Sequence, residues 1–553
     1  MAGPDPGIAM APGSEFDGVF IGGGHQSLVC AAYMAKAGLD VAVLERSHTV
    51  GGGLSTIDTS GEGFRFNLHS INHFHVPHTP WYSDLDLESA GVEYIRPEHE
   101  FAQPHSDGSG IVLSRDRERT VEIISEFSEA DADQYDRQSR VAEQLTGHIY
   151  LAERYDEPLP PDERRDLLES TELGREFLRW TTTSAFDLVD EWYESERLKT
   201  LFLFKLAIFG EPGEGVDNPS HKGGITRCFN GKHTYQIARG GSQMLALGLQ
   251  QVIQQHGGSV FTNCEVDSID VEDGRAVGVT LADGTSFGAR QFVASGVDVH
   301  QTYDRFVGRD RLPESMASKL ESFEYTEWSL MGTHFALEEA PDYEAAEAVP
   351  EMNNALKYNL GMESLEDIRG AHDAVVDKTM PEETAFGGGA LTTFDHTQAP
   401  DGKHTAYAWQ VAPYDVHGDP ENWRTEAERC RDNVLGKWSE YAPNMTEENV
   451  VHSYTYSPRQ IVKSVPNMVQ GDIFMGAFHE DQTLHNHIGY RSPIDGLFLC
   501  GSATHPGGAI NGAPGYIAAK VIHEELGMEP WWDPVDAREQ LANLDDVEVA
   551  ASV

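Results

Sequence analysis

The chain has 553 residues, of which 90 are acidic and 40 basic, so its formal net charge at pH 7 is −50. Such an excess of negative charge repels nucleic acid and anionic lipid, which argues against a nucleic-acid partner and against more than peripheral membrane contact. A hydrophobic content of 39% is typical of a globular protein, and the length allows more than one domain. The acidity and the scarcity of lysine indicate either a salt-adapted cell or a GC-rich genome.

The cysteines and the chain termini bear on the compartment. Five cysteines are scattered without a CxxC pair, which argues against a disulfide framework or a zinc site and favours a reducing compartment. Residues 1–15 lack the basic and apolar regions of a signal peptide and are expected to form a disordered leader. No window approaches the roughly 18 uninterrupted apolar residues of a membrane span. We therefore expect a cytoplasmic protein.

Residues 16–45 predict a strand, a glycine turn, a helix and a second strand. A mostly apolar run ends at Gly22, Gly23 and Gly24, and small and apolar residues then follow at helical spacing, beginning near His25. Such glycines let the backbone approach a pyrophosphate at the positive end of the helix. Glu45, which ends the second strand, is placed to accept hydrogen bonds from a ribose hydroxyl. The unit predicts a dinucleotide site.

A second glycine turn follows the acidic residue. Arg46 is separated by four residues from Gly51, Gly52 and Gly53, and Leu54 comes next. A turn of this kind is useful where the backbone runs beside cofactor phosphates, and it favours FAD over NAD. Here the sequence resembles the phytoene desaturase-like flavoproteins, within the wider group that includes amine oxidases. Many of those proteins have arginine at the position of Gly53, so the chain is more similar to the branch of pyridine nucleotide-disulfide oxidoreductase domain-containing proteins and carotenoid ketolases.

Four histidines lie within ten positions, at His69, His73, His75 and His78. Imidazole is a common metal ligand, and His73 and His75 would share one face of a strand, but no nearby carboxylate or cysteine completes a set, so we predict no metal. The alternatives are a polar segment that faces the flavin or the substrate, and structural histidines. In the resembled family this segment leads toward the flavin ring, which makes His69 and His73 candidates for the catalytic base.

The middle of the chain predicts helices and a sheet. Residues 110–126 indicate a hairpin or a strand plus a helix, and Ser128 begins a helical region that is interrupted at residues 158–161. The apolar run 201–210 suits a buried helix or the wall of a pocket. Strands at 328–335, 390–394 and 407–411 could roof a substrate cavity, while much of 338–383 and 421–441 is expected to be helical.

Two later segments return to the nucleotide domain. Residues 235–295 contain a glycine turn, a helix and several strands, and the strand at Val266 is similar to the one whose backbone meets the adenine in the resembled family. Near the C-terminus a buried strand ends at Gly501 and Ser502, and a glycine-rich turn containing His505 leads into a helix at 516–526. This turn, which includes Ile510, Asn511 and Gly512, resembles the closing FAD motif.

The sequence thus predicts an α/β protein with a Rossmann-like FAD-binding domain, discontinuous in sequence, and a mixed α+β substrate domain. The expected FAD-binding segments are 16–90, 230–320 and 470–530, and the substrate segments are 91–229 and 321–469, followed by an acidic tail at 531–553. The resemblance implies an FAD-dependent dehydrogenase, desaturase or isomerase acting on a small apolar, isoprenoid or carotenoid-like substrate, with His69, His73 or His505 as base. An amine oxidase-like enzyme and a non-catalytic flavin-binding protein are the alternatives. The sequence gives no indication of oligomeric state.

Overall fold

The computed structural model describes residues 14–207, 235–478, 480–544, 547 and 549–550. Two seven-stranded sheets form its framework. The first sheet has the order β10 (Ser259–Phe261), β2 (Val41–Leu44), β1 (Ser14–Ile21), β13 (Ser286–Ser295), β12 (Arg275–Leu281) and β11 (Val266–Glu272), and β19 (Leu497–Leu499) also pairs with β13. Strands β10, β2, β1, β13 and β19 run parallel, whereas β12 is antiparallel to both of its neighbours. Three segments distant in sequence therefore build one sheet.

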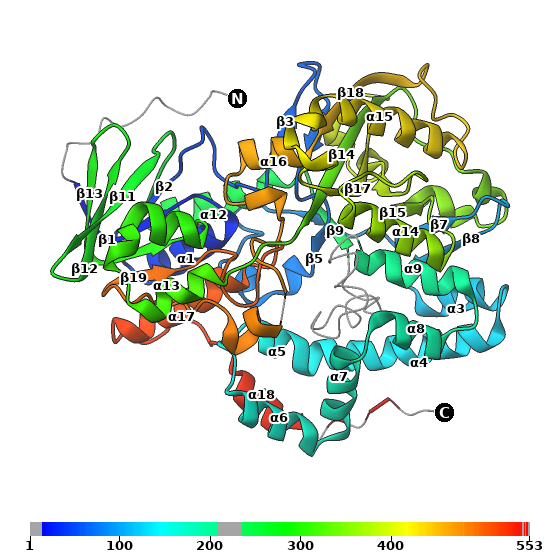
Figure 1. Cartoon of the computed structure of the whole chain (residues 1–553). Coiled ribbons are helices and arrows are strands. Elements are labelled where there is room, and N and C mark those ends of the chain that lie inside the picture. The colour runs from blue at the N-terminus through cyan, green and yellow to red at the C-terminus, as the bar shows by residue number, and fades with distance from the viewer. Residues whose placement is uncertain (1–13, 208–234, 479, 545–546, 548, 551–553) are drawn as a thin grey trace.

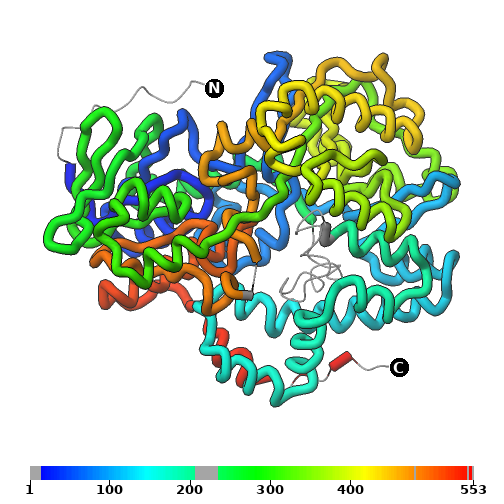
Figure 2. The backbone as a smooth tube through the Cα atoms, in the orientation of Figure 1, coloured from blue at the N-terminus to red at the C-terminus, as the bar shows by residue number. Residues whose placement is uncertain are grey.

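Helices cover both faces of this first sheet. One face carries α1 (His25–Lys36), α12 (Gln243–Gln255) and α17 (Ala513–Glu525), and the other carries η3 (Gln301–Gly308), η4 (Arg309–Arg311) and α13 (Glu314–Glu321). All four residues of β2 are buried, as expected for a parallel strand covered on both sides. Figure 2 shows the blue N-terminal and the orange-to-red C-terminal parts of the chain side by side in this lobe. The predicted discontinuous α/β arrangement is thereby confirmed.

The second sheet is mainly antiparallel and forms the other lobe (Figure 1). Its order is β18 (Val450–Tyr456), β14 (Trp328–Leu337), β17 (His404–Pro413), β16 (Phe386–Gly389), β15 (Ala355–Leu360), β7 (His99–Pro104) and β8 (Gly110–Ser114). Helix α15 (Trp423–Ser439) covers one face, where Trp438 packs against Phe335 and Phe386. All ten residues of β14 are buried, which is typical of a central strand.

A layer of helices covers the other face of the second sheet. It consists of α3 (Arg117–Ser125), α4 (Glu129–Leu145), η2 (Thr146–Tyr150), α5 (Leu151–Arg154), α6 (Pro161–Ser170), α7 (Glu172–Thr182), α8 (Ala185–Trp192), α9 (Glu196–Ala207) and α14 (Leu365–Val376). Ser128 caps α4 by accepting a hydrogen bond from the Asp131 amide at 3.1 Å, and α6 begins at Pro161, as predicted. In the described part of the chain, no helix is long and apolar enough to cross a membrane.

Short elements connect the two lobes. Strand β3 (Thr56–Asp58) pairs with β4 (Arg65–Asn67), and β9 (Tyr235–Ala238) pairs with β5 (His73–Phe74) and β6 (Tyr94–Ile95). The remaining helices are α2 (Pro80–Asp84), α16 (Pro458–Ser464) and α18 (Ala537–Ala542). Single turns of 3₁₀-helix are η1 (Val76–His78), η5 (Glu344–Glu347), η6 (Pro350–Asn354), η7 (Leu391–Thr393), η8 (His396–Gln398), η9 (Val416–Gly418), η10 (Pro420–Asn422), η11 (Val469–Gly471), η12 (Glu480–Gln482) and η13 (Leu484–Asn486).

The structure corrects three predictions about local structure. The strand expected at 390–394 lies at β16 instead, because the run of three glycines at 387–389 can follow a crowded sheet and the apolar residues after it turn into η7. Within 338–383, β15 is a strand and the helical prediction holds only for α14. His75 has φ 59° in a turn, so it does not share a strand face with His73.

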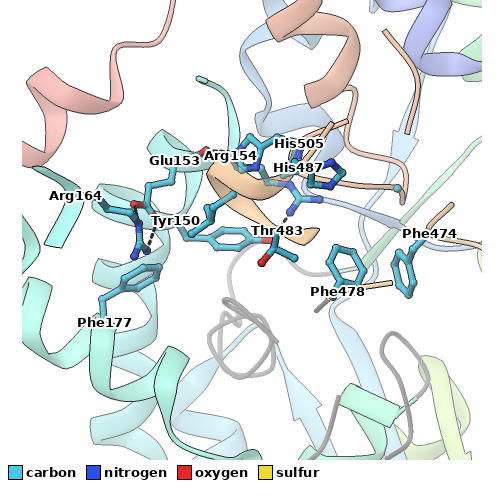
Figure 3. Close-up of a pocket in the computed structure, with 13 residues that line it drawn as sticks. Tyr150, Glu153, Arg154, Arg164, Phe177, Phe474, Phe478, Thr483, His487 and His505 are labelled. Carbon is cyan, nitrogen blue, oxygen red and sulfur yellow. Dashed lines mark hydrogen bonds and ion pairs between the residues drawn. The ribbon is translucent and has the colours of Figure 1, made fainter. Parts of the chain in front are cut away.

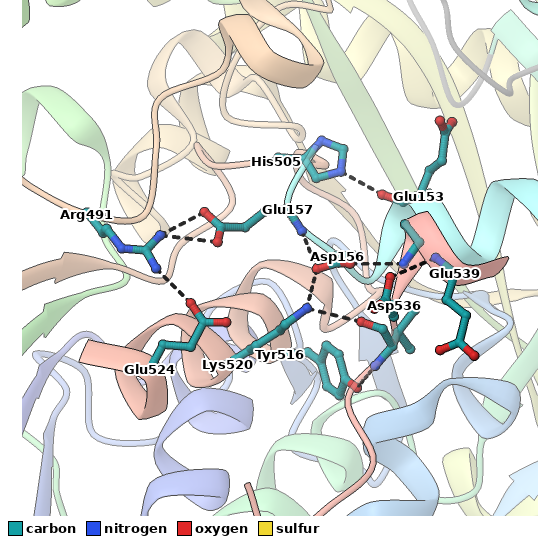
Figure 4. Close-up of polar contacts among 12 residues, drawn as sticks. Glu153, Asp156, Glu157, Arg491, His505, Tyr516, Lys520, Glu524, Asp536 and Glu539 are labelled. Atoms are coloured by element: carbon teal, nitrogen blue, oxygen red, sulfur yellow. Dashed lines mark hydrogen bonds and ion pairs between the residues drawn. The ribbon is translucent and has the colours of Figure 1, made fainter. Parts of the chain in front are cut away.

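The chain termini also differ from the prediction. Strand β1 begins at Ser14, inside the expected leader, and residues 1–13 lie outside the described residues. The segment expected to be an acidic tail packs against the molecule: Trp531 and Trp532 contact the Tyr33 ring of α1 with centroids 5.3 and 4.7 Å away. Figure 4 shows the adjoining polar network, in which Asp156 accepts hydrogen bonds from Lys520 of α17 at 2.6 Å and from the first amide of α18 at 3.0 Å.

Candidate active site

The two N-terminal glycine turns lie side by side at the start of α1. Gly22 has φ 90°, a conformation that disfavours any side chain, and the Gly51 amide donates to the Gly23 carbonyl at 2.8 Å. A side chain at Gly24 would meet open space, and one at Gly52 would lie 3.6 Å from the Gly24 Cα. No side chain caps α1, so its first amides face this opening and suit a phosphate group.

Glu45 lies beside this opening at the end of β2. Its carboxylate accepts hydrogen bonds from the Gly23 amide at 2.7 Å and the Ser47 amide at 2.8 Å, which leaves lone pairs for a hydroxyl group. The Cys264 amide donates to the Glu45 carbonyl at 2.8 Å, which brings the chain that leads into β11, and with it Val266, beside the acid. Arg46 is exposed and donates to the Ser464 carbonyl at 2.9 Å, and the side chain of Leu54 is part of the core.

The C-terminal turn closes the opening from the other side. The Asn511 side chain accepts from the Ala513 amide at 2.8 Å, and its carbonyl accepts from the Trp81 indole at 2.6 Å. Ala509 has φ 83°, and its carbonyl accepts from the His25 ring at 3.1 Å, which ties this turn to the start of α1. Gly512 caps α17, and Gly501 lies against the Gly296 backbone. The predicted motifs at the two ends of the chain therefore meet.

A pocket of about 940 Å³, including its open mouth, lies where these turns converge. Seven of the predicted site residues line it: Gly24, His25, Gly52, Gly53, His69, Ser502 and Ile510. The rest of the wall is formed by Gln26, Ser27, Ser70, Asn72, Gly296, Trp409, Val465, Asn467, Met468, Ile473, Phe474, Met475 and Ala509. None of these described lining residues is acidic, lysine or arginine.

The three histidine candidates are not brought together. His69 lines the pocket, and its Nε2 lies 3.0 Å from the Tyr456 hydroxyl, while Nδ1 is buried without a partner among the described residues. His73 is buried outside the pocket lining, with Nδ1 2.5 Å from the Tyr94 hydroxyl. His505 lines a different pocket and its Nε2 lies 2.9 Å from the Glu153 carbonyl. Burial lowers the pKa of His69 to about 4, so its ring is neutral at pH 7.

These residues fit a bound FAD. The paired glycine turns leave backbone surface open to a pyrophosphate, Glu45 suits a ribose, and the pocket continues to the space beside His69. Ser70 Oγ, Asn72 Oδ1 and His69 Nδ1 are buried polar atoms without a hydrogen-bond partner in the described chain, and such atoms are costly unless a ligand or water satisfies them. A ligand with polar edges and an apolar ring would satisfy both parts of the wall.

The apolar half of the wall was largely missed by the sequence. Trp409 lies on a strand that was expected to roof a cavity, but Val465, Met468, Ile473 and Met475 come from an irregular segment without periodicity. The apolar run at 201–210 belongs to α9, and its residues 201–204 are core rather than pocket wall, while 208–210 lie outside the described residues. No group of histidine, cysteine or carboxylate side chains in the described part of the chain could hold a metal ion.

Comparison with known proteins defines the class. Residues 28–336 match the family model of flavin containing amine oxidoreductases. One of the limonene dehydrogenase proteins of Castellaniella defragrans is 30% identical over 95% of this chain and 98% of its own length, and a neurosporene-forming phytoene desaturase of Cereibacter sphaeroides is 25% identical over 94% and 96%. The structure of putrescine oxidase superposes with a TM-score of 0.61 at 15% identity, covering 93% of this chain and all of that one, which supports the fold.

The chain therefore belongs to the flavin-containing amine oxidoreductase family, and it is an FAD-dependent oxidoreductase of the phytoene desaturase-like kind. This confirms the resemblance that the glycine motifs indicated, together with the cofactor and the enzyme class.

Proposed function

We propose that this enzyme removes a hydride from a small, uncharged, apolar substrate of the isoprenoid class. The observation that carries the proposal is the composition of the pocket wall, which combines Trp409, Met468, Ile473 and other apolar side chains with no charged side chain among its described residues. A charged substrate would lose its hydration there without gaining a counter-ion. Because the same space must also admit the flavin ring, the volume favours a small substrate.

The names of the relatives support this substrate class. Limonene and phytoene, named in two of them, are isoprenoid hydrocarbons without charge. An amine oxidase-like activity fits less well, because a cationic amine would need an acidic side chain in the pocket. We infer that the negative charge of the protein serves its surface rather than its substrate site.

FAD, when bound, supplies the hydride acceptor. The chain's own residues would hold the substrate in a dry pocket and receive the proton that leaves after the hydride. We assign the second role to His69, because it lines the pocket, is neutral at pH 7 and has an Nδ1 without a partner among the described residues. For Nδ1 to accept a proton, Nε2 must carry hydrogen and donate to the Tyr456 hydroxyl, which is 3.0 Å away.

Flavin reduction by candidate substrates tests the proposal. The purified FAD-bound protein is mixed without oxygen with limonene or with putrescine, and the oxidised-flavin absorbance is followed. We expect bleaching by limonene alone. Bleaching by putrescine alone would indicate an amine oxidase, and bleaching by neither, across a panel of isoprenoid hydrocarbons, would favour a non-catalytic flavin protein.

The Asn72→Asp variant is a matched test of the charge argument. It places a carboxylate of the same shape in the pocket, where Asn72 donates to the Tyr407 hydroxyl at 2.7 Å. We expect weaker reaction with the hydrocarbon and better binding of an amine. Unchanged preference would show that the missing charge does not select the substrate.

A cytoplasmic location is part of the proposal. Cys30 and Cys500 are buried, hydrogen-bonded to each other and free, as are the other two described cysteines, Cys264 and Cys430. Neighbouring thiols that stay reduced are typical of a reducing compartment, which supports the location that the cysteine pattern predicts.

A further inference from the structure

A second pocket, of about 770 Å³ including its mouth, adjoins the flavin pocket (Figure 3). Phe474 lines both pockets, and the turn that bears Ala509 toward the flavin pocket presents Gly508 to the second one. The Gly508 amide donates to the Phe474 carbonyl at 3.1 Å, so the wall between the pockets is held closed by a backbone hydrogen bond. The volume is in the range of about 300–1,000 Å³ that small ligands occupy. The second pocket is therefore a separate compartment.

Most of this compartment is apolar. Phe177 from α7, Phe478 and Phe474 present rings to it, and Phe474 and Phe478 pack edge to face with centroids 5.1 Å apart. Its two arginines are already engaged, because Arg164 donates twice to the Glu153 carboxylate and Arg154 donates to the Tyr150 hydroxyl at 2.6 Å. The wall thus offers an apolar body most of its contacts.

Two polar atoms interrupt the apolar wall. Thr483 Oγ1 and His487 Nδ1 are buried without a hydrogen-bond partner among the described residues, and their side chains are 6% and 9% exposed. His487 hydrogen-bonds the Ala503 carbonyl, and since Nδ1 has no partner among those residues, this bond uses the hydrogen on Nε2. The ring is neutral, because burial and the neighbouring His505 and Lys319 lower its pKa to about 3. Nδ1 therefore carries a lone pair and accepts a hydrogen bond, whereas the Thr483 hydroxyl can donate one.

We propose that the second pocket binds an apolar alcohol, whose hydroxyl group donates to His487 Nδ1 and accepts from Thr483 Oγ1 while its hydrocarbon body packs against the phenylalanines. A ketone or an ether lacks the hydrogen that Nδ1 requires, and a pure hydrocarbon leaves both polar atoms unsatisfied. The isoprenoid skeleton of the alcohol rests on the proposed function, but the hydroxyl requirement does not.

The test is calorimetric titration of the FAD-bound protein with geraniol and with three molecules of the same skeleton. These are geranyl methyl ether, which keeps the acceptor but loses the donor, 2,6-dimethylocta-2,6-diene, which loses both, and geranic acid, which carries a charge. We expect geraniol to bind about tenfold more tightly than the ether, since one unsatisfied buried partner costs roughly that factor. Equal binding of the ether, or tighter binding of the acid through Arg154, would overturn the proposal.

The Thr483→Val variant assigns the binding to this pocket. It keeps the shape of the side chain and removes the hydroxyl, so geraniol affinity should fall about tenfold while the oxidised-flavin spectrum is unchanged. Thr333→Val is the matched control, because Thr333 on β14 is also buried, has an Oγ1 without a partner among the described residues and lines neither pocket. Geraniol binding that is unaffected by Thr483→Val would refute the site. Flavin bleaching is not measured here, so failure of the proposed function leaves this result interpretable.

Discussion

The two halves of the flavin pocket are built by different means. The half that holds the cofactor is made of backbone turns and small residues, such as Gly24, Gly52 and Ser502, whereas the substrate half is made of side chains, such as Trp409 and Met468. A backbone turn needs glycine at fixed spacings, so it leaves a local mark in the sequence. An apolar wall needs only bulk from several distant segments. The comparison explains why the sequence alone indicates the cofactor but not the substrate.

The largest expected effect concerns the substrate half. His69→Gln should lower the turnover number by about 10²–10⁴, the usual contribution of a positioned proton acceptor, without changing the flavin content. Tyr456→Phe, which removes the partner of His69 Nε2, should cost less, because it leaves the ring in place. The measurement is anaerobic flavin reduction across a range of pH. A His69→Gln rate within about threefold of the unmodified enzyme would exclude His69 as the proton acceptor.

The next effect concerns the packing under the cofactor half. A Cβ at Gly515 of α17 would lie 2.1 Å from the Gln26 carbonyl oxygen of α1, so Gly515→Ala should destabilise the fold by about 1–3 kcal/mol and reduce FAD content. Gly370 in α14 is exposed, with no neighbouring atom within 4 Å, so Gly370→Ala should stabilise by up to about 1 kcal/mol. Denaturant unfolding measures both. Equal effects of the two alanines would show that the crossing of α1 and α17 tolerates a wider spacing.

A smaller effect is expected at the ribose position. Glu45→Gln should weaken FAD binding about tenfold, because the amide replaces one acceptor oxygen with a donor. Arg46→Ala is the neighbouring control and should leave FAD affinity unchanged, since Arg46 is exposed and contacts the Ser464 carbonyl. Equilibrium titration of the apoprotein with FAD gives both values. Loss of affinity in Arg46→Ala instead would restore that residue to the site.

Acid should weaken both halves gradually. Burial lowers the pKa of His25, in the cofactor half, and of His69, in the substrate half, to about 4 in each case. Below the unfolded pKa of about 6.5 the unfolded chain binds protons that the folded chain refuses, so stability falls as the pH drops from 6.5 toward 4, by up to about 1.4 kcal/mol per pH unit for each ring. Unfolding free energies at about pH 6.5 and pH 5 measure this loss. His69→Gln should reduce it, and an unchanged slope would contradict the assignment.

Several parts of the fold followed directly from residue patterns. Strand, turn and helix at 16–45, the cap at Ser128 and the break before Pro161 all rest on local chemistry, and all are confirmed. The failures are tertiary. The strand at β15 has mixed polar and apolar sequence because Lys357 and Asn359 are buried in the second sheet, and the second pocket depends on Thr483 and His487 facing residues of α7 from a distant part of the chain. No local pattern encodes such a pairing.

The packing of Trp531 and Trp532 on Tyr33 has a consequence for how the protein is made. Helix α1 is among the first elements to leave the ribosome, but the rings that cover it are synthesised about 500 residues later, as is α17, which crosses it. Until then the apolar surface of α1 has no native cover on that side. The cofactor site is consequently completed near the end of translation, and an FAD molecule that binds the finished chain holds its first and last segments together.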